Sequence, residues 1–308
     1  MSAQQKTVLV VGATGNLGTL ITRALIAQPD VDVRLLVRPQ SRDKVAAVFG
    51  AAVTLVEADL TSDHDILRAA CEGVFTVVSV VQGGPEVIID GQLALLRAAA
   101  DAGVTRFIPS DYSFNIFGLD PGENINTDWR RTFAERSSEV RGPVQIVHIM
   151  IGCFLDLGVL FGFLGAFDLQ AGTMPLWGDG RVPMDFTTYA DTAQYTALAA
   201  TREQVPERVQ VVGDRRDFWQ LKELVEAETG RSFDVIRHGE LADLDAEISQ
   251  RQAAAPDNVF AWLPLMYWRG MLSGKGQLAH TVNDAFPEVS PTSIAEYARQ
   301  HRAQLAGS

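Results

Sequence analysis

The sequence is poor in cysteine, in lysine and in positive charge overall. Cys71 and Cys153 are the only cysteines in 308 residues, too few for a secreted disulfide scaffold, so we expect a cytoplasmic protein with free thiols. Basic residues number 26 against 38 acidic ones, which gives a formal net charge of −12. Such a surface repels the phosphates of nucleic acids and of anionic membranes, so we expect neither as a partner. Only four of the basic residues are lysines: Lys6, Lys44, Lys222 and Lys275.

One long apolar run, residues 149–167, lacks the features of a membrane span. It has the length of a span but contains a charge, Asp156, and four glycines, and it has no basic flank. We therefore expect a buried helix that packs against a pocket or against the second subunit of a homodimer. We also expect no targeting segment, because the apolar run after Lys6 breaks at Gly12.

The first half of the chain alternates continuous apolar runs with amphipathic segments. Such runs are typical of strands buried on both faces, and successive β-α-β units form a doubly wound parallel sheet. We predict an α/β fold with an NADP-binding Rossmann domain over residues 1–150. A smaller C-terminal α/β substrate lobe spans 151–308, and some of its strands and helices return to the sheet. The predicted strands are 7–11, 33–37, 53–56, 74–81, 104–108, 144–150 and 209–212, and the predicted helices are 17–27, 41–49, 66–71, 88–102, 128–139, 189–200 and 218–229.

A glycine-rich turn follows the first predicted strand: Gly12-Ala13-Thr14-Gly15-Asn16-Leu17-Gly18. Glycines let the backbone turn tightly and approach a pyrophosphate, which rests on the helix N-terminus with its partial positive charge. The spacing G-x-x-G-x-x-G between a strand and a helix therefore predicts a dinucleotide site. The alternative is a glycine-rich turn that binds nothing.

The end of the second predicted strand distinguishes NAD from NADP. An NAD site places Asp or Glu there, where the carboxylate accepts from the ribose 2′-hydroxyl and repels a 2′-phosphate. Here the strand ends in Arg38, and no acidic residue occurs from Val33 to Arg42. Arg38 can stack on adenine and hold the phosphate, and Lys44 supplies a second cation, so the pattern favours NADPH. In the alternative interpretation both side chains only solvate the surface.

Further short motifs follow one another over nearly the whole chain: Leu36-Val37-Arg38-Pro39, Arg106-Phe107-Ile108-Pro109-Ser110-Asp111, Gly152-Cys153-Phe154, Trp177-Gly178-Asp179-Gly180, Tyr189-Ala190-Asp191, Phe286-Pro287-Glu288-Val289 and Glu296-Tyr297. Together with Gly12–Gly18, they resemble the isoflavone reductase-like and NmrA-like family of atypical short-chain dehydrogenases/reductases. The resemblance implies NADPH at Gly12–Gly18, Arg38 and Lys44. It also implies that Asp59 and Leu60 lie near adenine, Ser79 near ribose, and Gly152–Phe154, which includes Cys153, near nicotinamide.

The resemblance implies an activity but also exposes a departure. The plant reductases of the family reduce phenylpropanoid-type aromatics by hydride delivery to an enone or a benzylic carbon, and they carry a catalytic lysine at the start of the helix predicted at 128–139. This chain has Asp128-Trp129-Arg130-Arg131-Thr132 there and no lysine between Lys44 and Lys222. Arginine cannot replace lysine as a proton shuttle, because its pKa lies above about 12. A Tyr-x-x-x-Lys pair is also absent.

The remaining candidates for proton transfer follow the fifth predicted strand, at the carboxyl edge where open α/β sheets bind ligands. Tyr112 could donate a proton to a developing alkoxide or enolate, with Arg131 or Arg130 stabilising the charge. Asp111 could orient either group. In the alternative interpretation, Ser110 and Asp111 are hydrogen-bonding loop residues and Tyr112 is a packing residue.

The histidines and the aromatic residues leave further alternatives. His148 ends a predicted strand, where a core histidine is expected more often than a base. The five histidines have no ligand spacing, so we predict no metal site. The aromatic cluster at 255–275, made of Phe260, Trp262, Tyr267 and Trp268, either packs a core or lines a pocket for a flat apolar substrate.

Two functions follow from these observations. The first is an NADPH-dependent reductase of a small aromatic or conjugated carbonyl or enone, with Tyr112 or water as the proton source. The second is a non-catalytic NADP(H)-binding redox sensor of the NmrA type, which binds a protein partner. The missing lysine favours the sensor, and the aromatic second lobe favours the reductase. Epimerase or lyase chemistry on the same scaffold is a third, weaker alternative.

Overall fold

The computed structural model of the protein describes residues 5–306, and the chain forms two compact units. Unit 1 comprises the described residues up to Tyr112, together with Trp129–Ile149 and Thr192–Val209. Unit 2 comprises Ser113–Asp128, Met150–Asp191 and the described residues from Gln210 onward. The chain therefore returns to unit 1 twice. The predicted boundary at residue 150, between a Rossmann domain and a substrate lobe, stays a prediction.

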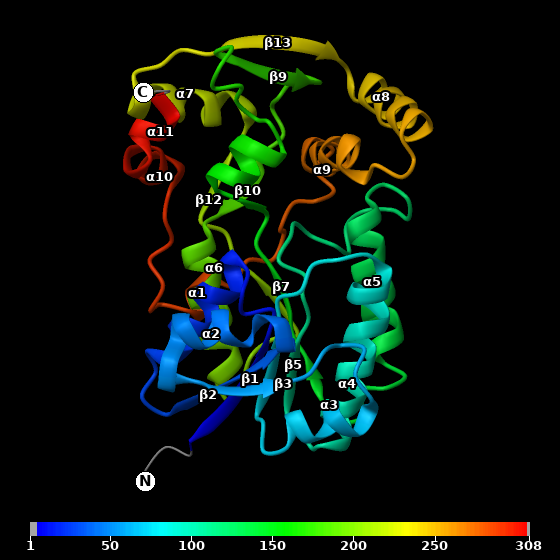
Figure 1. Ribbon diagram of the computed structural model, residues 1–308. Helices are drawn as coiled ribbons and strands as arrows, with labels where there is room; N and C mark the ends of the chain where they lie inside the picture. The colour runs from blue at the N-terminus through cyan, green and yellow to red at the C-terminus, as the bar shows by residue number, and fades with distance from the viewer. Residues whose placement is uncertain (1–4, 307–308) are drawn as a thin grey trace. The chain divides into compact units, whose positions relative to one another are not determined.

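Unit 1 is built on a six-stranded parallel sheet with the strand order β3-β2-β1-β4-β5-β6 (Figure 1). This order confirms the predicted α/β fold with a doubly wound sheet. Its elements are β1 (Lys6–Val11), α1 (Asn16–Ile26), β2 (Val31–Val37), η1 (Pro39–Ser41), α2 (Arg42–Phe49), η2 (Gly50–Ala52), β3 (Thr54–Glu57), α3 (His64–Cys71), β4 (Thr76–Ser79), η3 (Glu86–Gly91), α4 (Gln92–Asp101), β5 (Arg106–Ile108) and β6 (Gln145–Ile146). Four elements cross from one unit to the other: α5 (Ile125–Ser137), β7 (His148–Met150), α6 (Tyr189–Thr201) and β11 (Arg208–Gln210).

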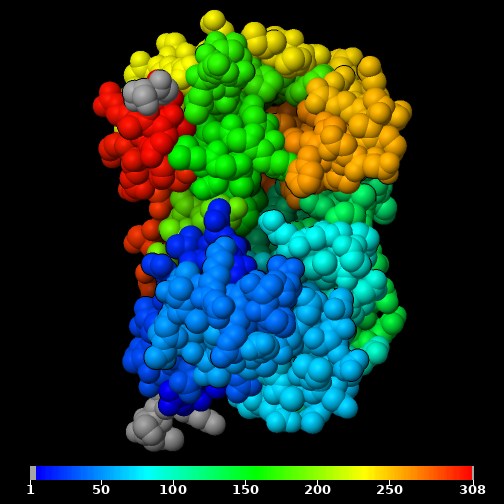
Figure 2. Space-filling model, viewed as in Figure 1, coloured from blue at the N-terminus to red at the C-terminus, as the bar shows by residue number. Residues whose placement is uncertain are grey.

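Helices pack on the sheet of unit 1 through buried apolar side chains. Leu67 of α3, Leu96 of α4 and Phe133 of α5 belong to one cluster with the sheet residues Leu9 and Phe107. The burial of such side chains is the main favourable contribution to folding. In the space-filling view, the blue and cyan surfaces of the first hundred residues form one continuous body (Figure 2).

Arg106 on β5 fastens the end of α6 to the sheet. Arg106 is 1% exposed, and its Nη1 donates to the carbonyl oxygens of Ala199 at 2.7 Å and Arg202 at 2.8 Å. Nε donates to Oε1 of Gln145 on β6 at 2.9 Å. A buried charge is tolerated only with such partners, so residues 192–209 complete the interior of unit 1.

Unit 2 contains a three-stranded sheet of order β12-β10-β8 and a two-stranded parallel sheet of β13 and β9 (Figure 1). Its core is formed by side chains from α7, α8, α9 and α10 together with the strands. The elements are β8 (Cys153–Phe154), η4 (Leu157–Phe163), β9 (Thr173–Trp177), β10 (Met184–Thr187), β12 (Asp214–Arg216), α7 (Phe218–Thr229), β13 (Asp234–Gly239), α8 (Leu241–Ala254), η5 (Val259–Ala261), α9 (Leu263–Leu272), η6 (Asn283–Ala285), α10 (Ile294–Gln300) and α11 (Arg302–Ala306).

The apolar run at 149–167 does not form the predicted single helix. It holds part of β7, then β8 and the π-helix η4, whose first turn is capped by the Asp156 carboxylate, the acceptor for the N–H of Gly158 at 2.8 Å. Gly152 has φ +73°, and a Cβ there would lie 2.3 Å from the carbonyl oxygen of Asp185 on β10. The prediction was wrong because this close packing between strands outweighs helical periodicity. Among the described residues, no helix has the length and apolar character needed to span a membrane.

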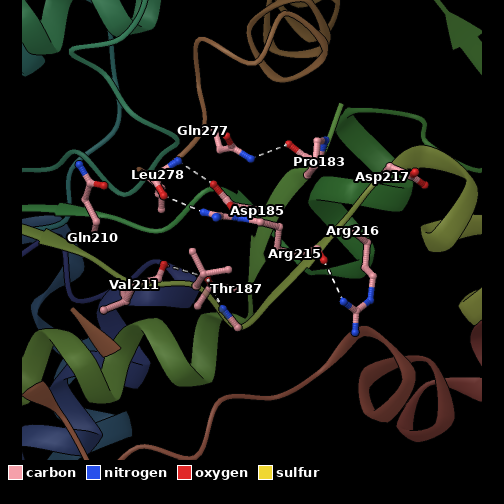
Figure 3. A network of polar contacts seen from close by, with 12 residues as sticks. Pro183, Asp185, Thr187, Gln210, Val211, Arg215, Arg216, Asp217, Gln277 and Leu278 are labelled. Carbon is pink, nitrogen blue, oxygen red and sulfur yellow. Dashed lines mark hydrogen bonds and ion pairs between the residues drawn. The ribbon is translucent and has the colours of Figure 1, made fainter. Parts of the chain in front are cut away.

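Asp185 is the centre of a polar network that joins β10, β12 and the segment after α9 (Figure 3). Its carboxylate accepts from Nε of Arg215 at 2.5 Å and from the backbone N–H of Leu278 at 2.7 Å. Arg215 Nη2 in turn donates to the carbonyl oxygen of Leu278 at 2.6 Å. The Asp185 side chain is 1% exposed, so these partners replace the water that burial removes.

The aromatic residues at 255–275 divide between core and surface. Trp262 and Trp268 are buried in the core of unit 2, whereas Phe260 is 76% exposed. Tyr267 packs edge-to-face on Phe163 at a centroid distance of 5.9 Å. The core interpretation therefore describes the two tryptophans.

Candidate functional site

The glycine turn lies where β1 ends, next to the end of β4. Gly12 has φ +95°, and a Cβ at this position would lie 2.5 Å from the carbonyl oxygen of Val80. Only glycine fits there, because a side chain would meet both an unfavourable backbone conformation and a fixed backbone atom. The turn is closed by a hydrogen bond from Thr19 Oγ1 to the carbonyl oxygen of Ala13 at 3.0 Å.

The N-terminus of α1 is open to a ligand. Its N-cap is Gly15, which has no side chain to cap the first-turn N–H groups. Thr14, Gly15 and Asn16 are exposed, and Leu17 is buried as the first core residue of the helix. A Cβ at Gly18 would lie 2.2 Å from the carbonyl oxygen of Gly12, so turn and helix touch backbone to backbone. This arrangement suits a pyrophosphate, which needs free N–H groups and close approach.

Ser79 supplies an independent indication that a polar group belongs here. It is the last residue of β4 and pairs in register with Val11, the residue before Gly12. Ser79 is fully buried, and its Oγ has no hydrogen-bond partner among the described residues. An unpaired buried hydroxyl is costly, so a ligand hydroxyl at this position would relieve the cost. The residues present therefore fit a dinucleotide.

Two unpaired cations lie after β2. Arg38 and Lys44 are exposed, and neither has an ion-pair partner in the part of the chain that the structure describes. Arg42, between them, pairs with Glu57 at the end of β3, with 2.5 Å from Nη1 to Oε1. Asp59 and Leu60 follow β3 and are half-buried, and the Asp59 carboxylate accepts from the N–H and hydroxyl of Thr61, both at 3.0 Å.

The predicted catalytic residues occupy the turn after β5. Asp111 is buried and pairs with His148, with 2.7 Å from Oδ2 to Nδ1. This pair was not predicted, because the two residues are 37 positions apart and no local spacing links them. Ser110 Oγ donates to the carbonyl oxygen of Val81 at 2.7 Å, and its N–H donates to Gln92 Oε1 at 2.9 Å.

Tyr112 is the most unusual residue of this turn. It has φ +31°, the one positive value for a non-glycine residue in the described chain, and such strain is commonly found at functional sites. Its hydroxyl is buried without a hydrogen bond of ordinary geometry. Burial raises the pKa of Tyr112, and the nearby Thr196 hydroxyl offsets part of the rise. The phenol is therefore held in its protonated form.

Arg130 is the arginine that reaches this turn. Its Nε donates to the carbonyl oxygens of Ser110 at 3.0 Å and Asp111 at 3.1 Å. Arg131 is half-buried one position further along α5. The sequence could not show which of the two arginines contacts the turn, because it does not fix which way each side chain of the helix points.

Cys153 and Phe154 belong to unit 2, on β8. The Phe154 ring lies against the Tyr189 ring at the start of α6, with centroids 4.1 Å apart. Burial raises the pKa of Cys153 to about 12, and Asp156 adds to the rise. Burial likewise raises the pKa of Tyr189 to about 12. Residues 5–306 contain no cluster of three or more His, Cys, Asp or Glu side chains arranged to hold a metal.

Comparison with known proteins places the chain in a family. The sequence profile of the NmrA-like family matches residues 4–238. The chain belongs to the NmrA-like family. This membership confirms the resemblance that the motifs indicated. Probable pinoresinol-lariciresinol reductase 3 from Arabidopsis thaliana is 28% identical over 231 residues, which cover 73% of this chain and 72% of the relative.

Solved structures show the same fold. The structure of AtPrR2 with NADP+ and (+)-pinoresinol superposes with a TM-score of 0.79 at 22% identity, covering 97% of this chain and 99% of that one. The complex of leucoanthocyanidin reductase with NADPH from Vitis vinifera gives a TM-score of 0.74 at 18% identity, with 96% and 99% covered. At this identity the likeness concerns the fold.

Proposed function

We propose that this NmrA-like protein is an oxidoreductase that binds NADPH and reduces a small aromatic or conjugated carbonyl or enone compound. The observation that carries the proposal is the open glycine turn Gly12–Gly18 followed by two exposed, unpaired cations, Arg38 and Lys44. An NAD site would require a carboxylate in place of Arg38. The names of the relatives, reductases of pinoresinol and of leucoanthocyanidin, support an aromatic substrate.

Each part of the site has a proposed role in holding the cofactor. The first-turn N–H groups of α1 would bind the pyrophosphate, and Arg38 with Lys44 would bind the 2′-phosphate. Ser79 Oγ would pair with a ribose hydroxyl. By resemblance, Asp59 and Leu60 would lie near adenine, and Cys153 and Phe154 near nicotinamide. When bound, NADPH supplies a hydride.

The chain itself must then supply a proton. We assign this role to the Tyr112 hydroxyl, which burial keeps protonated, with Arg131 or Arg130 stabilising negative charge and Asp111 positioning the turn through His148. The hydroxyl is enclosed, so this proposal requires that it gain access to the substrate. A cytoplasmic location and a homodimer remain predictions.

A redox sensor without catalysis is the second candidate. Two observations favour it: no lysine lies between Lys44 and Lys222, and the Tyr112 hydroxyl is enclosed. The sensor and the reductase share the cofactor site, but only the reductase turns over a substrate and only the sensor requires a protein partner.

Calorimetry and an activity panel together test the proposal. The purified chain should bind NADPH at least tenfold more tightly than NADH, an increment of about 1.4 kcal/mol. Pinoresinol, a leucoanthocyanidin and small aromatic enones should then be tested for substrate-dependent oxidation of NADPH at 340 nm. Equal affinities for the two cofactors would overturn the cofactor assignment. Tight NADPH binding without turnover of any compound would favour the sensor.

A further inference from the structure

A carboxylate lies close to the proposed phosphate site, although the sequence around Arg38 has none. Glu57 ends β3, and the parallel register sets it beside Val37, the residue directly before Arg38. Among the acidic residues near this edge, Asp43 lies on the first turn of α2. The Asp59 carboxylate is engaged by Thr61 in its own turn. The register therefore sets Glu57 beside the strand end that Arg38 directly follows.

Arg42 holds this carboxylate. The first residue of α2 places its guanidinium on Glu57, with Nη1 at 2.5 Å from Oε1. The helix lies on the surface of unit 1 that faces the viewer, within the blue region of Figure 2. The side chains of Arg42 and Glu57 are 50% and 43% exposed, and pairs this exposed contribute little to folding stability.

We propose that Arg42 is a specificity-determining residue that selects the phosphorylated cofactor indirectly, by occupying Glu57 and leaving Arg38 free. This inference rests on the proposed binding of NADPH. Without Arg42, the Glu57 carboxylate would turn to Arg38, directly after the neighbouring strand β2, and would also repel the 2′-phosphate. Both effects weaken binding of the 2′-phosphate of NADPH. They do not weaken binding of NADH, because its 2′-hydroxyl carries no charge and can donate a hydrogen bond to the carboxylate.

A double-mutant cycle tests the inference, with NADPH and NADH affinities measured by calorimetry at one fixed salt concentration. Arg42→Ala should raise the Kd for NADPH by about fivefold, the effect expected of one charge pair near the surface. It should change the Kd for NADH by less than about twofold. Adding Glu57→Gln to Arg42→Ala should return the NADPH affinity to within about twofold of the wild type.

Two control variants define what the pair does. Arg42→Lys keeps the charge and should retain the NADPH preference. Arg68→Ala removes a comparable exposed pair, from α3 to Glu72 at its C-cap, and should leave both affinities unchanged. Thermal unfolding of each variant should match the wild type, because the pair is exposed.

The outcomes separate this inference from the proposed function. A wild type without preference for NADPH would refute the cofactor assignment on which the inference rests. A wild-type preference that survives Arg42→Ala would overturn the inference alone. Equal weakening of Arg42→Ala and of the double variant would also overturn it, since Arg42 would then contact the phosphate directly.

Discussion

Asp111 and His148 face each other inside unit 1, with 2.7 Å between Oδ2 and Nδ1, although 37 positions separate them in the chain. Asp111 follows β5, and His148 begins β7. The contact therefore connects the turn that carries Tyr112 to the first residue of β7. A second tie is the hydrogen bond from the N–H of Tyr112 to the carbonyl oxygen of Ile149 at 3.1 Å. Together they hold Tyr112 in its strained conformation.

Replacing Tyr112 by phenylalanine distinguishes a catalytic hydroxyl from a packing residue. The hydroxyl has no hydrogen-bond partner of ordinary geometry, so Tyr112→Phe should change the free energy of unfolding by less than about 0.5 kcal/mol, or increase it. If the hydroxyl donates the proton, kcat should fall about 10²-fold or more. Tyr297→Phe is the control: its hydroxyl accepts from Leu157 N–H at 2.9 Å, so stability should fall by about 1 kcal/mol. Unchanged kcat in Tyr112→Phe would move the proton source to water.

Arg38 should dominate the discrimination between the two cofactors. Arg38→Ala should erase most of the NADPH preference, and Lys44→Ala should remove a smaller part, because a planar guanidinium binds phosphate through two parallel hydrogen bonds. Calorimetric titration with NADPH and NADH measures both effects. A preference that persists in the double variant would place the 2′-phosphate elsewhere.

The glycines of the turn should separate binding from folding. A Cβ at Gly15 would lie 3.7 Å from the carbonyl oxygen of Gly12, an ordinary contact, so Gly15→Ala should cost less than about 1 kcal/mol of stability. The added methyl group would nonetheless stand at the helix N-terminus and weaken NADPH binding by about tenfold or more. Gly18→Ala, with its Cβ 2.2 Å from the carbonyl oxygen of Gly12, should cost about 3 kcal/mol or more. Chemical denaturation and calorimetry give the two quantities, and normal NADPH affinity in Gly15→Ala would refute the assigned pyrophosphate position.

Removing Asp185 should destabilise unit 2. Asp185→Ala deprives Arg215 of its carboxylate and the buried N–H of Leu278 of its acceptor. We expect a loss of about 2–3 kcal/mol, less than for a fully buried pair because Arg215 is 39% exposed. Arg181→Ala breaks a long pair, at 3.7 Å, between an exposed guanidinium and the half-buried Asp217, and it should stay within about 0.5 kcal/mol of the wild type. Equal denaturation midpoints for the two variants would show that the network does not support the fold.

Both thiols should be slow to react in the folded protein. For the same reason, the free energy of unfolding should fall at alkaline pH. Burial raises the pKa of Cys71 and of Cys153 to about 12, from an ordinary value of 9.0. Between these values the unfolded chain has lost protons that the folded chain keeps, so the free energy of unfolding should fall as pH rises from about 9 to 12. Labelling with a disulfide reagent at pH 8 should be slow until denaturant exposes both thiols. Fast labelling of the native protein would contradict this burial.

Local signals account for the parts of the fold that the sequence predicts well. The helix predicted at 218–229 has those bounds in α7, because Asp217 forms a capping box with Gln220 and Gly230 ends the helix at φ +73°. The glycine turn could also be predicted, because all its parts lie within seven residues. The strand predicted at 144–150 is instead two: Ile146 pairs with Phe107 on β5, whereas the N–H of His148 donates to the carbonyl oxygen of Glu207. This change of strand partner depends on residues that are distant in the sequence. The Asp111–His148 pair and the close packing of Gly152 depend on distant residues too. The periodicity of apolar residues does not show such contacts, so they could not be predicted.

The burial of Arg106 has a consequence for how the protein is made. A ribosome releases β5 about ninety residues before it releases Ala199 and Arg202, whose carbonyl oxygens receive the guanidinium. During that interval the nascent sheet holds a positive charge without its acceptors, and its edge stays open to wrong contacts. A chain truncated near residue 150 would remain at this stage permanently. Expression of the nucleotide-binding half alone should therefore yield aggregate, whereas a chain that continues past residue 209 contains every segment that unit 1 needs.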